Sequence, residues 1–282
     1  MIKSKIKTFL KANTVTSLWL VCYVAIQSLT AMAVLIYKTL TDMEFAEKFL
    51  VIFEPILVIE STLEKQWKTY EGLSILMSGK MGVILLISSL LLMLIITLNI
   101  LVGKKTLDLY RITNSEVIEF CFLGTILNLF LTLLVSLIPA SISKSHDVLT
   151  NLAVSNGLGM DVLATGIVVP ICEELIFRYC ILRSLLPINR KFAVVYQALL
   201  FGLLHGNLVQ ATYAFGLGCL FGYLYLTRKN LLYPILLHVS INLSSVLVFY
   251  MGIGEGLGLT ILSAFLFCLL LRNKFAILLQ RR

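Results

Sequence analysis

Apolar residues form long runs along most of this chain, and short polar stretches separate them. An α-helix needs about 20 such residues to cross the hydrocarbon core of a bilayer. Eight runs approach that length, although the fifth is short, and we predict a spanning helix for each of them: 15–37, 81–102, 117–139, 161–182, 192–206, 209–226, 231–250 and 257–271. The pattern therefore predicts an all-α, polytopic transmembrane bundle of about eight spanning helices.

Composition and the first segment agree with this class. Hydrophobic residues make up 59% of the 282 residues and charged residues 13%, and the mean hydropathy is +0.96, far from the balance of a soluble domain. The basic start MIKSKIK resembles a signal peptide, but the apolar run after it is too long and no small-residue cleavage site follows. We predict a retained helix there, and an interfacial or re-entrant segment at 49–59, which contains Glu54 and Pro55.

The distribution of Lys and Arg predicts the orientation, because cytoplasmic loops carry an excess of both. With the N-terminus inside, only six of the 23 fall in outer segments: Lys38, Lys48, Lys65, Lys68, Lys80 and Lys144. Both termini are therefore predicted to be cytoplasmic. Topology and anionic lipid headgroups account for the net charge of +8, so no nucleic-acid partner is needed.

No repeat or long linker divides the chain. We predict an N-terminal membrane region at 1–115, with two helices and an outer loop, and a core at 116–282, where the polar residues cluster within 161–250. Small residues at four-residue spacing predict close helix packing at Gly202, Gly206, Gly218 and Gly222. The six cysteines lack C-x-x-C spacing, so they are predicted to be small core residues.

Two adjacent acids, Glu173 and Glu174, lie inside the fourth apolar run. Ionisable groups in a spanning segment cost several kcal/mol unless they face a partner or a water-filled cavity, so they indicate a functional site. Arg178 follows Glu174 by four residues and shares its helix face, whereas Glu173 points about 100° away. Pro170 should loosen this helix and free backbone carbonyls. A buried structural network of the three charged residues is the alternative.

Two of the three histidines also lie in apolar runs. His205 shares a helix face with Phe201, and His238 shares one with Asn242, while His146 is predicted in an outer loop. A carboxylate and imidazoles can polarise water directly or hold a divalent metal that does so, and an amide beside a histidine can stabilise an oxyanion. The chain has no H-E-x-x-H and no G-x-S-x-G motif, which argues against a zincin and an acyl-enzyme.

The segments EELIFR, FGLLH and HVSIN, in this order on successive predicted helices, resemble the three motifs of the CPBP family of intramembrane proteases. This family includes the type II CAAX prenyl endopeptidases and bacterial bacteriocin-processing or self-immunity proteins. The resemblance covers about 161–250 and none of the first 110 or so residues. It implies that Glu173 and His205 activate the water, that Arg178 orients Glu174, and that His238 and Asn242 stabilise the oxyanion.

The resemblance leaves the cofactor open, because the family can be described as metalloproteases or as metal-independent glutamate proteases. Zinc or another divalent metal would need Glu173, His205 and His238 to converge, and three protein ligands with a water make a catalytic zinc set. Along the predicted helices His205 lies nearer the outer side than His238. The fifth helix must therefore begin deeper or tilt for these groups to meet.

The function predicted from these residues and the resemblance is an intramembrane endopeptidase in a bacterial plasma membrane. Its partners would be the lipid bilayer and a peptide or membrane-protein substrate, in bacteriocin or pheromone processing or in self-immunity; prenylated substrates are less expected. One alternative is a non-catalytic immunity or regulatory protein that binds a bacteriocin or a sensor kinase. A proton-coupled transporter is the other, but the chain lacks the inverted repeats that would favour it.

Overall fold

The computed structural model describes residues 2–53, 71, 72 and 74–252. Within these ranges the regular secondary structure is helical, and no strand occurs. The predicted all-α class is therefore confirmed. The predicted helix at 257–271, most of the interfacial stretch at 49–59, and Cys268 lie outside the described residues.

Helices follow the predicted apolar runs closely. The first half of the chain holds α1 (Ile2–Thr41), α2 (Met43–Phe53), α4 (Met81–Val102), α5 (Asn114–Ser136) and α6 (Ala140–Ala153). The second half holds α10 (Arg190–Leu203), α11 (Leu208–Arg228) and α12 (Leu232–Met251). Among the described residues, α4, α5, α11, α12 and residues Ile6–Thr41 of α1 are long and apolar enough to span a membrane. The chain is thus a polytopic membrane protein, while the number of spans stays a prediction.

The predicted helix at 161–182 is a longer and less regular element. Residues 158–185 run without a break through α7 (Leu158–Asp161), η2 (Val162–Val168), α8 (Val169–Glu174), η3 (Leu175–Leu182) and α9 (Arg183–Leu185), where η2 and η3 are π-helical. We call this element the central rod. Helices α1, α4, α10, α11 and α12 all contact it.

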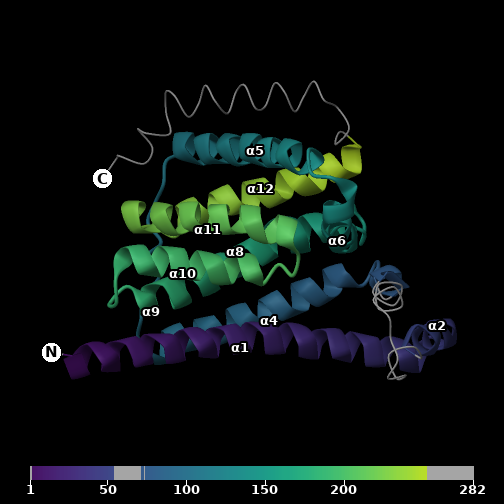
Figure 1. Cartoon of the computed structure of the whole chain (residues 1–282), viewed down its shortest axis with the longest axis horizontal. Coiled ribbons are helices and arrows are strands. Elements are labelled where there is room, and N and C mark those ends of the chain that lie inside the picture. Colours follow the sequence, from purple (N-terminus) through teal and green to yellow (C-terminus); the bar gives the residue numbers. More distant parts are fainter. Residues whose placement is uncertain (1, 54–70, 73, 253–282) are drawn as a thin grey trace.

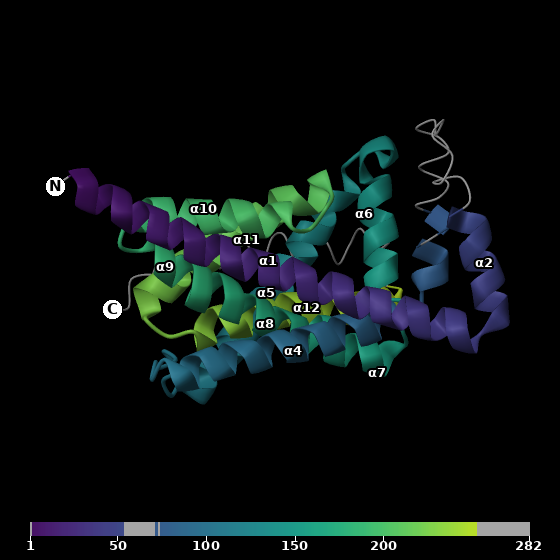
Figure 2. The ribbon, with the colours of Figure 1, turned by 90° about the horizontal axis from the view of Figure 1, so that it is seen from below.

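The stack of helices around the rod is visible in Figure 1, where α5, α12 and α11 lie above the α8 part of the rod and α4 and α1 lie below it. Figure 2 shows the long helix α1 crossing this core. Many side chains of the rod are accordingly buried, and Cys172, Ile176, Ile181 and Leu182 have no exposed surface. The rod is therefore positioned by its neighbours on several sides.

Segments that were assigned to the cytoplasmic side meet at one end of the bundle. Arg183 forms an ion pair of 3.5 Å with Asp108 and donates a hydrogen bond to the carbonyl of Thr106. The backbone N–H of Leu231 donates to the carbonyl of Asp108 at 2.7 Å. The N-terminus and α9 lie at this end, and α2 and α6 lie at the opposite end (Figure 1). Which end faces the cytoplasm stays a prediction.

Close packing of α10 against α11 is confirmed at three of the four predicted glycines. A Cβ atom on Gly218 would lie 3.0 Å from the Cα of Ala198. Added Cβ atoms on Gly202 and Gly222 would meet neighbouring atoms at 2.6 and 2.8 Å. The prediction is wrong for Gly206, which has a φ of +73° and nothing within 4 Å of an added Cβ. It lies in the turn between the two helices, where a positive φ favours glycine.

The described cysteines are free thiols: Cys22, Cys121, Cys172, Cys180 and Cys219. Two of them, Cys172 and Cys180, are buried core residues as predicted, and the other three are half-buried.

Candidate active site

The rod places the adjacent acids between two π-helical segments. Glu173 and Glu174 end α8, with η2 before and η3 after it. In η2 the N–H of Val169 donates to the carbonyl of Ala164, five residues earlier. The next bond of this pattern would run from residue 170 to the carbonyl of Thr165, but proline has no N–H. π-Helical turns are frequent at functional sites.

The carbonyl of Thr165 finds a replacement donor on another helix. The side-chain Nδ2 of Asn242, on α12, donates to it at 3.2 Å. The prediction that Pro170 frees a carbonyl which a neighbour satisfies is thus confirmed. One of the two amide hydrogens of Asn242 is used in this way, and the proline in the rod helps to hold the asparagine at the site.

Glu174 is closed off from solvent and held by two basic side chains. Its side chain is 0% exposed, and Oε2 lies 3.0 Å from Nε of Arg178, as the four-residue spacing predicted. Its other oxygen, Oε1, lies 2.8 Å from Nδ1 of His238 on α12. A buried carboxylate needs such partners, so Glu174 connects Arg178 to His238.

The guanidinium of Arg178 is fully buried among aromatic rings. Its central carbon lies 4.8 Å from the ring centroid of Phe201 and 5.1 Å from that of Phe221, distances at which a cation is attracted to an aromatic face. Its Nη2 donates to the carbonyl of Gly218 at 3.4 Å, and Gln197 donates to the same carbonyl at 2.8 Å. The close approach of α10 and α11 therefore brings this carbonyl to the arginine.

Glu173 lies in a different environment from Glu174. Its side chain is 12% exposed, whereas that of Glu174 is 0% exposed. Oε1 accepts a hydrogen bond of 3.1 Å from the hydroxyl of Tyr23 on α1, and Oε2 lies 3.7 Å from Nε2 of His238. Two carboxylates in unequal environments can take different roles in acid–base chemistry.

The helix predicted at 192–206 ends at Leu203, so His205 lies in the turn after α10. Its side chain is half-buried there. Its Nδ1 lies 2.7 Å from the carbonyl of Phe201. A carbonyl oxygen only accepts, so Nδ1 carries the hydrogen and, in the neutral ring, Nε2 is left as the acceptor. The ring of Phe201 lies 4.9 Å from that of His205 and 5.8 Å from that of His238. Phe201 thus connects the two histidines.

The predicted metal ligands do not form a cluster. Within the part of the chain that the structure describes, no group of three His, Cys, Asp or Glu side chains could hold a metal ion. Glu173 and His238 face each other, and His205 does not join them in a group of three donors. These donors do not fit the zinc set of Glu173, His205 and His238 that the sequence suggested, and we derive no reaction step through a metal.

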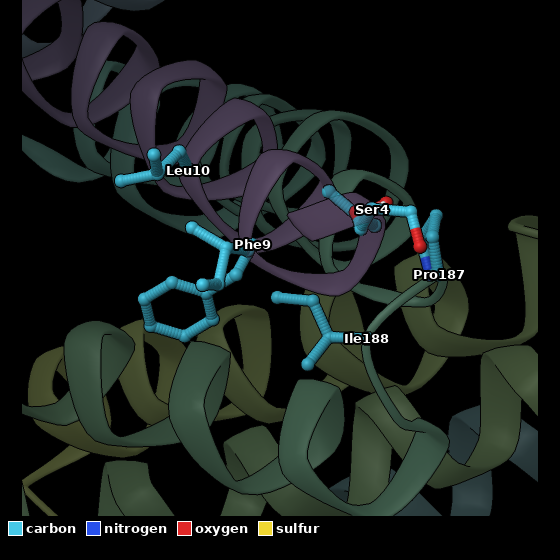
Figure 3. Close-up of a pocket in the computed structure, with 7 residues that line it drawn as sticks. Ser4, Phe9, Leu10, Pro187 and Ile188 are labelled. Atoms are coloured by element: carbon cyan, nitrogen blue, oxygen red, sulfur yellow. Dashed lines mark hydrogen bonds between the residues drawn. The ribbon is translucent and has the colours of Figure 1, made fainter. Parts of the chain in front are cut away.

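A pocket of about 520 Å³ lies elsewhere in the molecule. None of the candidate site residues lines it, and its lining residues come from α1 and the turn after α9: Ser4, Ile6, Thr8, Phe9, Leu10, Pro187 and Ile188 (Figure 3). Its walls are mostly apolar and include Phe9 and Leu10. The pocket is therefore separate from the acid–histidine site.

Four residues of the site were missed by sequence reasoning: Tyr23, Gln197, Gly218 as a carbonyl acceptor, and Phe221. Gln197 precedes Phe201 by four residues and His205 by eight, so helical periodicity could have found it. Tyr23 lies 150 residues from Glu173 in the chain, and no local pattern indicates their contact.

A family model described as type II CAAX prenyl endopeptidase Rce1-like matches residues 156–244, a range that includes all six predicted site residues. This match supports the resemblance to the CPBP family for the part of the chain that holds the three motifs. The chain is also similar to a Bacillus subtilis (strain 168) protein named "Putative membrane peptidase YdiL", with 29% identity over 173 residues, which covers 58% of the chain and 69% of the relative. No solved structure matches.

The comparisons and the helices together support a protease located as a multi-pass protein in the plasma membrane. The matched range begins after α6. Helices α1 and α4, which contact the central rod, therefore lie outside it.

Proposed function

We propose that this protein is an intramembrane endopeptidase in which Glu173 activates the attacking water. One observation carries the proposal: of two adjacent buried acids that face the same histidine, only Glu173 has exposed side-chain surface, at 12% against 0% for Glu174. A general base must be reachable by the water that it deprotonates. Glu174, held by Arg178 and His238, is then a structural acid that orients the histidine.

In the proposed reaction, Glu173 takes a proton from water while the water oxygen attacks the carbonyl carbon of the peptide bond. The resulting tetrahedral intermediate collapses as the C–N bond breaks, and the proton on Glu173 passes to the leaving nitrogen. The products are a carboxylic acid and an amine, so atoms and charge balance. His205 assists by accepting a hydrogen bond from the water at Nε2, since its Nδ1 is held by the carbonyl of Phe201.

The negative oxygen of the intermediate needs hydrogen-bond donors that are already in position. Asn242 has a second amide hydrogen besides the one bonded to Thr165. His238 faces Glu173 through Nε2, and this nitrogen donates when the ring carries both protons. Glu174 holds the other ring nitrogen, much as a carboxylate orients the histidine of a catalytic triad.

The substrate class that we propose is a peptide or a membrane-protein segment that enters the bundle, with bacteriocin or pheromone precursors as the bacterial examples, or a role in self-immunity. The alternative function is that of a non-catalytic immunity or regulatory protein that uses the same polar network for stability or docking. The comparisons favour the protease, because the family model and the relative both carry peptidase descriptions.

The test compares cleavage of a quenched fluorogenic peptide library by the detergent-purified wild type and by Glu173→Gln. We expect the variant to lose a factor of about 10² or more, the usual contribution of a general base, with an unchanged melting temperature. His205→Gln should also lose activity. Glu119→Gln, near the start of α5, removes the same charge in another helix and should keep wild-type activity.

A chelator added to the wild-type assay separates the two kinds of activated water. Unchanged cleavage supports a carboxylate-activated water, and loss of cleavage that zinc restores supports a metal-bound one. Equal cleavage by the wild type and Glu173→Gln would contradict the proposal. If none of the proteins, including the wild type, cleaves any peptide in the library, the result would favour the non-catalytic alternative.

A further inference from the structure

Helix α1 reaches the candidate active site through one side chain. Tyr23 is 7% exposed, and its hydroxyl donates to Oε1 of Glu173 at 3.1 Å. Its ring meets the ring of Phe177, on the rod, edge-on, with 6.4 Å between centroids and an interplanar angle of 75°. The tyrosine thus lies against the rod with its hydroxyl directed at Glu173, the acid with exposed side-chain surface.

The two acids differ in how their oxygens are held. Both oxygens of Glu174 have close basic partners, Arg178 and His238. For Glu173, the 3.7 Å separation between Oε2 and His238 is too long for a hydrogen bond, whereas the bond from Tyr23 to Oε1 is within range. The terminal torsion of a glutamate is broad and holds the carboxylate plane weakly. A hydrogen bond at one oxygen therefore decides which way the other oxygen points.

We propose that Tyr23 is a positioning residue for Glu173. It holds Oε1, so that Oε2, on the side of His238, is the oxygen that takes the proton from water. This inference rests on the proposed role of Glu173 as the base. It makes α1, which lies outside the matched range of 156–244, a part of the active site.

The test is Tyr23→Phe, which removes the hydroxyl and keeps the ring against Phe177. The matched control is Tyr225→Phe on α11. Tyr225 is also buried, at 3% exposed, and its hydroxyl also donates to a carboxylate, Oδ2 of Asp108, at 2.6 Å. That bond ties the segment between α4 and α5 to α11, away from the two acids.

With a fluorogenic peptide that the wild type cleaves, we expect Tyr23→Phe to lower kcat by about tenfold or more and to leave KM within about twofold. The factor corresponds to a hydrogen bond to a charged group that must be made in the transition state. Tyr225→Phe should leave kcat unchanged. If Tyr23→Phe also leaves kcat unchanged, or raises KM alone, the positioning role is overturned.

A double variant shows whether the hydroxyl acts through Glu173. In the Glu173→Gln background, Tyr23→Phe should cause no further loss of the residual activity, because coupled residues are not additive. A further loss of about tenfold would overturn the inference while leaving Glu173 as the base. Full activity of Glu173→Gln alone would instead overturn the proposed function.

Melting temperatures test the contact between Tyr23 and Glu173 without any cleavage assay. The four proteins are the wild type, Tyr23→Phe, Glu173→Gln and the double variant. We expect Tyr23→Phe to shift the melting temperature less in the Glu173→Gln background than in the wild type, because the amide of glutamine accepts a weaker hydrogen bond from the tyrosine than the carboxylate does. Shifts that add fully would overturn the contact, and with it the positioning role, even if no peptide in the library is cleaved.

Discussion

At the scale of single residues, partners decide what each buried charge can do. Glu174 and Arg178 are both 0% exposed and pair with each other, and Phe201 and Phe221 cover the guanidinium. Removing one member of a buried pair leaves an uncompensated charge, which costs far more than the loss of an exposed pair. An exposed ion pair in the same chain allows a comparison: Arg183 pairs with Asp108, and their side chains are 37% and 28% exposed.

We expect Arg178→Leu to lower the free energy of unfolding by about 3–5 kcal/mol, the cost of breaking a buried ion pair. Arg183→Leu should lower it by about 1 kcal/mol or less, because solvent screens that pair. Unfolding of the detergent-solubilised protein with increasing SDS measures both. The double variant Arg178→Leu with Glu174→Leu should recover most of the loss, and equal effects of the two arginine variants would contradict the argument.

At the scale of elements, the contact between α10 and α11 positions the arginine. Gly218 lets the helices approach until an added Cβ would lie 3.0 Å from atoms of Ala198. Its carbonyl then accepts from Arg178 and from Gln197. The glycine that allows this close packing therefore also places a carbonyl acceptor next to Arg178.

Gly218→Ala should separate α10 from α11 and lower the free energy of unfolding by about 1–3 kcal/mol, the usual cost of overpacking. Peptidase activity should fall with it, since the Gly218 carbonyl moves away from Arg178. Gly216→Ala is the control on the same helix. An added Cβ there meets nothing within 4 Å, so alanine should be neutral or stabilise by up to about 1 kcal/mol. SDS unfolding and peptide cleavage provide the measurements, and equal losses in both variants would contradict the prediction.

At the scale of the whole molecule, the bundle has two chemically different ends. Arg183, Asp108 and Leu231 join the segments that carry many of the basic residues at one end. At the other end, Lys144 on α6 pairs with Glu71. The excess of Lys and Arg predicts that the first end faces the cytoplasm.

Cysteine labelling tests this orientation in a variant that lacks the native cysteines. In intact cells, Lys144→Cys should react with a membrane-impermeant maleimide, and Lys191→Cys, at the start of α10, should react only after the membrane is opened. Both positions are exposed. The reverse pattern would show that the predicted orientation is wrong.

Patterns in the sequence were enough to predict the membrane class, the positions of most helices, the pairing of Glu174 with Arg178, and the close packing at three glycines. These features depend on local spacing: the length of an apolar run, the four-residue repeat of a helix face, and small residues on one face. The family motifs in EELIFR, FGLLH and HVSIN also lie within short stretches of chain. No local pattern in the sequence predicted that the helix around Glu173 and Glu174 is π-helical on both sides of α8.

The packing of the helices, in contrast, determined which acid keeps exposed surface, which side chains surround the guanidinium, and that α1 provides a tyrosine to Glu173. Exposure depends on the helices that cover a residue, and the contact between Tyr23 and Glu173 joins positions 150 residues apart. It also decided that Nδ1 of His205 is bonded to a backbone carbonyl and that His205, Glu173 and His238 form no metal-holding group among the described residues. Sequence spacing places residues along one helix, whereas the packing of several helices brings their side chains to a common point.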